Sequence, residues 1–114
     1  MAKNKLAKFT DMATYSNVFQ YGFETLKKEG FPLQGKWNTY FANDQPIILE
    51  LGCGKGEYTV GMARKFPGKN FIGIDIKGAR MWKGATEARK ENITNAAFLR
   101  TRVELIHHFF AENE

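Results

Sequence analysis

Three short apolar runs stand out along the chain against longer stretches of mixed polarity. Residues 47–51 (IILEL), 70–75 (NFIGID) and 96–100 (AAFLR) are each five or six residues long and rich in aliphatic or aromatic side chains. Runs of this length and composition predict buried strands. A turn, NDQP at residues 43–46, precedes the first of them.

The stretches between these runs have helical spacing. Residues 57–66 place Tyr58, Met62 and Phe66 at intervals of four, and Pro67-Gly68 ends that pattern. Residues 78–92 predict a second helix, and residues from 103 onward begin a third. In the second helix we expect three apolar side chains inward and four cations mostly outward: Met81, Ala85 and Ala88, against Arg80, Lys83, Arg89 and Lys90.

Alternation of strand and helix predicts an α/β fold, a doubly wound parallel sheet of the Rossmann type. The three strands should lie in the order 3-2-1, and in such sheets the next strand pairs on the far side of the first. The chain ends at Glu114 before that strand, so the fold is expected to be truncated after its third strand and helix. An open edge on strand 47–51 then predicts self-association or marginal stability.

Residues 1–45 are interpreted as an N-terminal lead-in, and residues 46–114 as half of the Rossmann-like domain. A short helix is predicted at about 18–29, with Gly30 as its stop. The aromatic residues of the lead-in are expected to pack inward on the sheet. For Lys3, Lys5 and Lys8 two alternatives stay open, contact with RNA phosphates or a solvated surface.

Charge and cysteine content narrow the class of protein only mildly. The net charge is +5, which suits an anionic partner such as RNA but also an ordinary solvated surface. Cys53 is the single cysteine, so no internal disulfide can form, which fits a cytoplasmic location. The sequence contains no membrane-length apolar run and no apolar signal core. His107 and His108 have no acid or cysteine at ligand spacing, so no metal site is predicted.

The densest signal is the loop GCGKG, which joins the strand 47–51 to the following helix. Gly52, Gly54 and Gly56 allow a tight turn and let a ligand reach backbone N–H groups at the start of the helix. Such a site suits an anion, either a carboxylate or a phosphate. Cys53, inside this loop, is interpreted as a small residue that fits the turn rather than a nucleophile.

Two acids flank the loop and suggest which ligand it takes. Glu50 ends the first strand region, where a buried carboxylate needs a partner such as an ammonium group. Asp75 ends the next strand and can accept hydrogen bonds from both hydroxyls of a ribose. An amino acid joined to a nucleoside describes S-adenosylmethionine. NAD is the competing ligand, but Glu57 stands where the third glycine of its usual G-x-G-x-x-G motif belongs.

The sequence resembles the bacterial tRNA (guanine-N7-)-methyltransferase family, over most of the chain. The residues that carry the resemblance are NKLAKFTDMATYSNVFQY, ILELGCGKGEYTVGMARKFP, NFIGIDIKGARMWKGATEAR and AAFLRT. The resemblance implies methyl transfer from S-adenosylmethionine to N7 of a guanine in the tRNA variable loop. It also implies that cofactor binding falls to the two acids and the glycine loop: Glu50, Asp75, Gly52, Gly54 and Gly56.

Two departures from the family pattern qualify this expectation. Arg102 stands where the family often has an acid or amide that reads the adenine, and a cation cannot accept the adenine amino hydrogens. Backbone groups around residues 101–103 are the alternative. The family's catalytic residues are expected beyond Glu114, so this cofactor-binding part should be poorly active alone. The other hypotheses are a non-catalytic RNA- or cofactor-binding fragment and, less favoured, an NAD enzyme.

Overall fold

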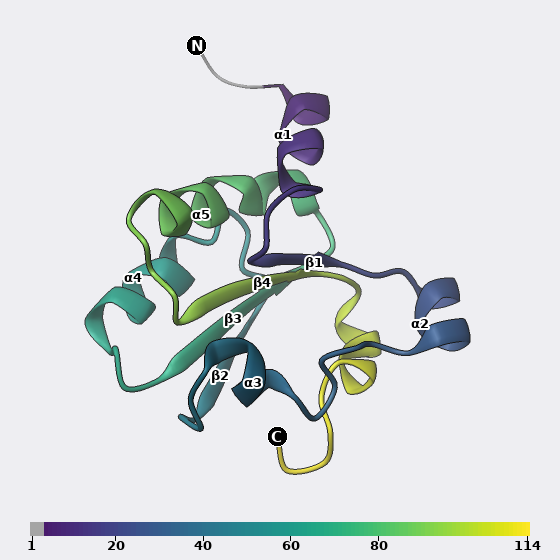
Figure 1. Ribbon diagram of the computed structural model, residues 1–114. Coiled ribbons are helices and arrows are strands. Elements are labelled where there is room, and N and C mark those ends of the chain that lie inside the picture. The colour runs from purple at the N-terminus through teal and green to yellow at the C-terminus, as the bar shows by residue number, and fades with distance from the viewer. Residues whose placement is uncertain (1–3) are drawn as a thin grey trace.

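The computed structural model describes residues 4–114 and contains a four-stranded parallel sheet flanked by helices (Figure 1). The elements follow in the order α1 (Lys5–Met12), β1 (Val18–Gln20), α2 (Phe23–Glu29), α3 (Trp37–Phe41), β2 (Ile47–Leu51), α4 (Glu57–Lys65), β3 (Asn70–Asp75), α5 (Gly78–Lys90), β4 (Ala96–Arg100) and a 3₁₀ helix, η1 (Val103–His108).

The sheet has the strand order β1-β4-β3-β2. All three predicted strands are confirmed with their predicted bounds, and they lie in the predicted order, with β3 between β4 and β2. Every neighbouring pair is parallel, as α/β crossovers require. The carboxyl ends of the strands therefore meet at one edge of the sheet. The register pairs Glu50 with Gly73 and Asp75 with Arg100 at that edge.

The lead-in contributes a strand that the sequence analysis missed. The prediction of one helix over residues 18–29 is wrong for its first part, because Val18, Phe19 and Gln20 form β1 beside β4. Only α2 is helical, and it ends as predicted at Gly30, which has a positive φ of 70°. The β-branched and aromatic residues of β1 suit a strand, and β1 lies beside β4 in Figure 1, far from it in sequence.

Alternating residues of the central strands contribute to hydrophobic clusters on both faces of the sheet. Ile72, Ile74 and Leu99 pack on one face with aromatic residues of the lead-in and with Phe109. Phe98 packs on the other face against α4 and α5. The aromatic residues were predicted to point inward, and for Phe31, Trp37 and Phe41 this is confirmed. Phe23 is an exception, because half of it is exposed.

The two long helices fit their predictions unequally. In α5 the inward side chains are as predicted, because Met81, Ala85 and Ala88 are buried. In α4 the spacing of Tyr58 and Phe66 is misleading. Tyr58 is 64% exposed, and the helix instead buries Thr59, Val60 and Ala63. These smaller side chains allow α4 to lie close to the sheet.

The strand β2 is an edge strand with apolar residues in solvent, although its composition predicts a buried strand. Ile48, Leu49 and Leu51 are 39%, 36% and 55% exposed. The open edge is thus confirmed, whereas burial of this strand within the chain is not. The third predicted helix is present only as the short η1. Among residues 4–114 no helix has the length and apolar character needed to cross a membrane.

Candidate functional site

The glycine loop and the two predicted acids meet at the carboxyl edge of the sheet. β2 leads into the loop, α4 begins directly after it at Glu57, and β3 ends beside it at Asp75. Because β2 and β3 are parallel neighbours, Glu50 and Asp75 come from adjacent strands. The structure therefore brings together Glu50, Asp75 and the loop, which were predicted to form one site.

Asp75 holds the loop through its carboxylate. The Gly54 amide donates to Asp75 Oδ2 at 2.9 Å, and the Lys77 amide donates to Oδ1 at 3.0 Å. Burial alone would raise the pKa of Asp75. Hydrogen bonds from the amides of Lys77, Gly54 and Ile76, together with the charge of Arg80, hold that pKa below its ordinary value. Asp75 is thus an ionised acceptor at neutral pH, and each oxygen retains a further lone pair.

Most amides of the loop are already used within the protein. Those of Gly52 and Cys53 donate to the Ile74 carbonyl, and that of Gly56 donates to the Cys53 carbonyl. The amides that have no protein acceptor in the described part of the chain are those of Lys55 and the first turn of α4. The amides that remain available to an anion are therefore those of Lys55 and the first turn of α4, and not those of the whole loop.

Glu50 has a partner inside the chain. The hydroxyl of Thr59, a buried residue of α4, donates a hydrogen bond to Glu50 Oε1. This bond fixes the direction of a half-buried carboxylate from the adjoining helix. The second oxygen, Oε2, accepts no hydrogen bond from residues 4–114 and can take a donor from a ligand.

Cys53 is close enough to both acids to be affected by their charges, and it is not suited to nucleophilic chemistry. Burial, followed by the charges of Asp75 and Glu50, raises the pKa of its thiol to about 12. The thiolate is the reactive form, so Cys53 stays inert at neutral pH. This agrees with its predicted role as a small residue in the turn.

The glycines of the loop serve different purposes. Gly52 has φ 72°, and a Cβ there would meet no atom within 4 Å, so its face is open. Gly56 has φ 79°, and a Cβ there would lie 2.6 Å from Phe98 Cε1 and 3.3 Å from Gly84 Cα. Gly56 thus lets α4, α5 and the sheet approach one another, whereas Gly52 leaves room for a ligand.

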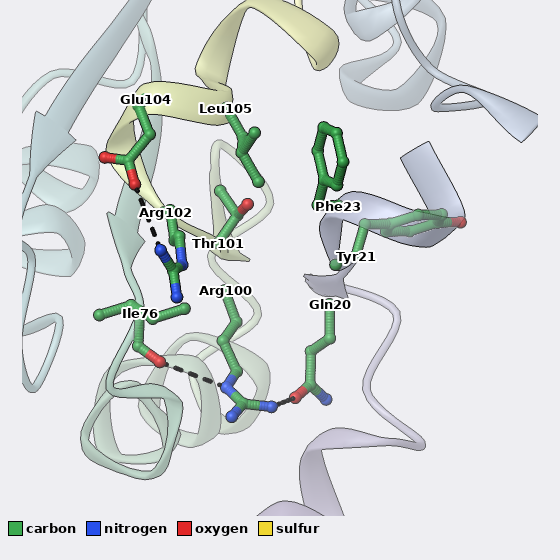
Figure 2. Close-up of a pocket in the computed structure, with 10 residues that line it drawn as sticks. Gln20, Tyr21, Phe23, Ile76, Arg100, Thr101, Arg102, Glu104 and Leu105 are labelled. Atoms are coloured by element: carbon green, nitrogen blue, oxygen red, sulfur yellow. Dashed lines mark hydrogen bonds and ion pairs between the residues drawn. The ribbon is translucent and has the colours of Figure 1, made fainter. Parts of the chain in front are cut away.

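A pocket of about 650 Å³ lies beside the site, at the carboxyl ends of β1 and β4 (Figure 2). Arg102 lines it, exposed at the start of η1, with its Nη1 3.8 Å from Glu104 Oε1. Ile76, the residue after Asp75, lines the same pocket. Arg102 therefore shares a pocket with the residue that follows Asp75, and its guanidinium has a carboxylate neighbour in η1.

The sequence analysis gave no side-chain role to three residues of this pocket, Ile76, Thr101 and Glu104. Ile76 presents an apolar surface that is 49% exposed. The hydroxyl of Thr101 is buried and has no hydrogen-bond partner among the described residues. Glu104 supplies a carboxylate next to Arg102. Their positions in the sequence could have indicated Ile76 and Thr101, because these residues directly follow the ends of two parallel strands.

The predicted RNA-binding lysines and the histidines are placed as follows. Lys5 and Lys8 lie on α1, next to α5, and line a second pocket with Lys77 and Arg80. Lys3 lies outside the described residues. His107 is exposed and His108 half-buried. Their rings are 4.2 Å apart, and residues 4–114 contain no group of three or more potential metal ligands.

The family model and the similar sequences all describe methyltransferases. Residues 44–114 match the family described as "Putative methyltransferase". The chain is 58% identical to a tRNA (guanine-N(7)-)-methyltransferase of Bacteroides fragilis, over all of the chain and 46% of that protein. It is 61% identical to the enzyme of that name from Porphyromonas gingivalis, over 90% of the chain and 43% of that protein. The chain spans about half the length of the curated relatives it matches.

Solved structures show the same fold. The antibiotic-resistance methyltransferase Kmr matches 57% of the chain and 32% of its own length, with a TM-score of 0.50 and 25% identity. WbdD matches 94% of the chain and 27% of its own length, with a TM-score of 0.52 and 18% identity. The predicted Rossmann-like methyltransferase fold is thereby confirmed for the part present here.

Proposed function

Because the chain belongs to this methyltransferase family, we propose that it is the cofactor-binding part of a tRNA (guanine-N7)-methyltransferase. The observation that carries the proposal is the placement of Glu50 and Asp75 on adjacent strands around an open glycine loop. The identity of more than half of the residues to enzymes of that name supports the same assignment. A tRNA substrate would place the protein in the cytoplasm.

The residues present fit S-adenosylmethionine. Asp75, ionised and with lone pairs to spare, would accept the two ribose hydroxyls. Glu50 Oε2 would accept the amino group, and the amides of Lys55 and the first turn of α4 would hold the carboxylate. The open face of Gly52 leaves space for the chain that joins these two ends. A pyrophosphate would instead bring negative charge towards two carboxylates, which disfavours NAD.

The adenine side of the cofactor would lie in the pocket lined by Ile76 and Arg102. Ile76 offers an apolar surface to the ring. Arg102 cannot accept the adenine amino hydrogens, so we assign that contact to Glu104 or to backbone groups of residues 101–103.

The chemistry makes few demands on these residues. S-adenosylmethionine, when bound, would supply a methyl group on a sulfonium. The incoming lone pair would form a bond to the methyl carbon while the carbon–sulfur bond breaks and S-adenosylhomocysteine leaves. Guanine N7 has such a lone pair and no proton to lose, so no general base is required. The chain contributes alignment, with the acids and the loop fixing the cofactor, which is a large part of catalysis by proximity.

For the isolated chain of 114 residues we propose cofactor binding with poor turnover. The support is that the chain spans about half the length of its relatives and leaves the apolar edge of β2 in solvent. A binding module without turnover is therefore the second candidate function.

A methyl-transfer assay separates these two candidates. Unmodified tRNA is incubated with labelled S-adenosylmethionine and the chain, alone or with the carboxy-terminal half of a relative. We expect labelled N7-methylguanine only in the mixture. A normal rate from the chain alone would contradict the proposal that the isolated chain binds the cofactor but turns over poorly. The absence of label in both samples would contradict the proposed methyltransferase activity.

A further inference from the structure

A second pocket, of about 660 Å³, lies between α1, the start of α5 and the carboxyl ends of β3 and β4. Its described lining residues include five basic side chains and no acidic one. The five are Lys5, Lys8, Lys77, Arg80 and Arg100, and we call this site the cation pocket. Its positive charge equals the net charge of the whole chain, +5.

The charges of the cation pocket are not neutralised by ion pairs. Elsewhere Arg64 pairs with Glu87 and Glu91, and Lys83 pairs with Glu57. Within residues 4–114 none of the five basic side chains of the cation pocket forms such a pair. A concave surface lined by several cations and no acid concentrates the field on an anionic ligand.

Two acids lie near the cation pocket, and each is committed to another contact. Asp75 is close enough to Arg80 to feel its charge, but its oxygens accept the amides of Gly54 and Lys77. Asp11 faces α5 from α1, and its Oδ2 accepts a hydrogen bond of 2.8 Å from Trp82 Nε1. Neither acid lines the cation pocket, although the charge of Asp75 offsets part of the charge of Arg80.

Two of the cations are held in place by the protein. Arg100 donates from Nε to the Ile76 carbonyl at 3.4 Å and from Nη1 to Gln20 Oε1 at 3.2 Å. Its guanidinium also lies 4.5 Å from the centre of the Phe9 ring. Lys8 Nζ lies 5.5 Å from the centre of the Trp82 ring. Such contacts reduce the conformational entropy that these side chains lose when they bind a ligand.

The cation pocket adjoins the cofactor site. Ile76 and Arg100 line both the cation pocket and the pocket assigned to adenine. Arg80 Nη2 lies 3.5 Å from the position that a Cβ on Gly54 would take, so this guanidinium covers the glycine loop. An anion in the cation pocket would therefore be positioned relative to the methyl donor.

We propose that the cation pocket binds the phosphodiester backbone of the tRNA substrate and so orients it towards the cofactor. This inference rests on the proposed function. Five cations drawn from a helix, two strand ends and a second helix provide more positive charge than one phosphate requires. They suit consecutive phosphates of a nucleic acid, which Lys and Arg contact without reading sequence.

The test is the salt dependence of tRNA binding. Dissociation constants of the chain and of Lys5→Gln/Lys8→Gln for unmodified tRNA are measured over a range of salt concentrations. Because each lysine that contacts a phosphate contributes about one to the slope of log K against log salt, the variant should lose about two. Its affinity at about 0.1 M salt should fall roughly tenfold.

Lys65→Gln/Lys69→Gln is the matched control. These two lysines are exposed, each lies over the ring of Phe66, and they sit at the opposite end of β3 from Lys77. The control should keep the slope of the unmodified chain. An equal loss in both variants would mean that only net charge matters and would overturn the proposal, as would unchanged binding in both.

Three further arms make the result specific. Lys5→Arg/Lys8→Arg should retain the affinity for tRNA, because the charge is kept. Inorganic phosphate, added at constant ionic strength, should not displace tRNA at millimolar concentration, and displacement would indicate a free-phosphate site instead. Binding of S-adenosylhomocysteine should be equal in all variants. If the unmodified chain fails to bind that compound, the proposed function fails, whereas loss of only the lysine effect overturns the cation pocket alone.

Discussion

The amide of Gly54 donates a hydrogen bond of 2.9 Å to the carboxylate of Asp75, so the tip of the glycine loop is tied to the end of the neighbouring strand. One acid thus sets the shape of the loop and remains available to a ribose. The loop and the end of β3 are consequently joined through one carboxylate, which under the proposed function would also bind the ribose.

Asp75→Asn should weaken binding of S-adenosylhomocysteine by about 10- to 100-fold, because a charged acceptor for hydroxyl groups is replaced by a neutral one. Calorimetry measures the change. Asp44→Asn, at an exposed acid before β2, is the control and should bind normally. Equal affinities for the chain and Asp75→Asn would contradict the assigned role of Asp75.

The same carboxylate should make stability depend on pH. The folded-state pKa of Asp75 is lowered, so its contribution is present above its ordinary pKa of 3.8 and is lost as pH falls through the lower folded value. The difference in free energy of unfolding between the chain and Asp75→Asn should therefore shrink below that pH. Urea titrations at neutral and acid pH measure it, and a constant difference would contradict the account.

Thr59→Val should destabilise the chain by about 1–2 kcal/mol, because Glu50 loses a buried hydrogen-bond donor while the shape of the side chain is kept. Affinity for S-adenosylhomocysteine should also fall, since Glu50 is no longer oriented. Thr39→Val, at an exposed position of α3, should change neither quantity. Unaltered affinity of Thr59→Val for S-adenosylhomocysteine would contradict the proposed role of Glu50 in cofactor binding.

Gly56→Ala should lower the free energy of unfolding by about 2–4 kcal/mol, through a Cβ clash with Phe98 and Gly84 added to an unfavourable φ. Urea denaturation measures the change. Gly68→Ala, where a Cβ meets nothing within 4 Å, should stay within about 0.5 kcal/mol of the chain. Similar values for the two variants would show that Gly56 does not control the approach of α4 and α5.

The open edge of β2 should promote self-association. Sedimentation velocity over a range of concentrations should detect association of the chain, and Ile48→Lys should reduce it by placing a charge on the exposed edge. A monodisperse monomer with slow amide exchange across Ile47–Leu51 would contradict this prediction.

Sequence reasoning located the parallel strands well because each is a compact apolar run, and β2, β3 and β4 match their predicted bounds. It missed β1, because three residues that pair with β4 across 80 positions carry no local signal of that partner. It also misread α4, where the large Tyr58 is exposed and Thr59 is buried. A helix that packs closely on a sheet buries small side chains, and a pattern based on the spacing of large hydrophobic residues does not identify that face.

For the candidate site, the sequence identified the two acids and the glycine loop but not the side chains that contact them. Thr59 as the partner of Glu50, Ile76 beside Arg102, and the joining of Lys8 with Arg100 in one pocket depend on tertiary contacts. The spacing of glycines likewise could not reveal that Gly52 is open and Gly56 is packed.

The most direct test of the account is a parallel calorimetric titration of the chain with S-adenosylhomocysteine and with NAD. We predict saturable binding of S-adenosylhomocysteine at one site per chain, reduced in Asp75→Asn, and no binding of NAD at millimolar concentration. Binding of NAD without binding of S-adenosylhomocysteine would contradict the assignment of the glycine loop and its two acids.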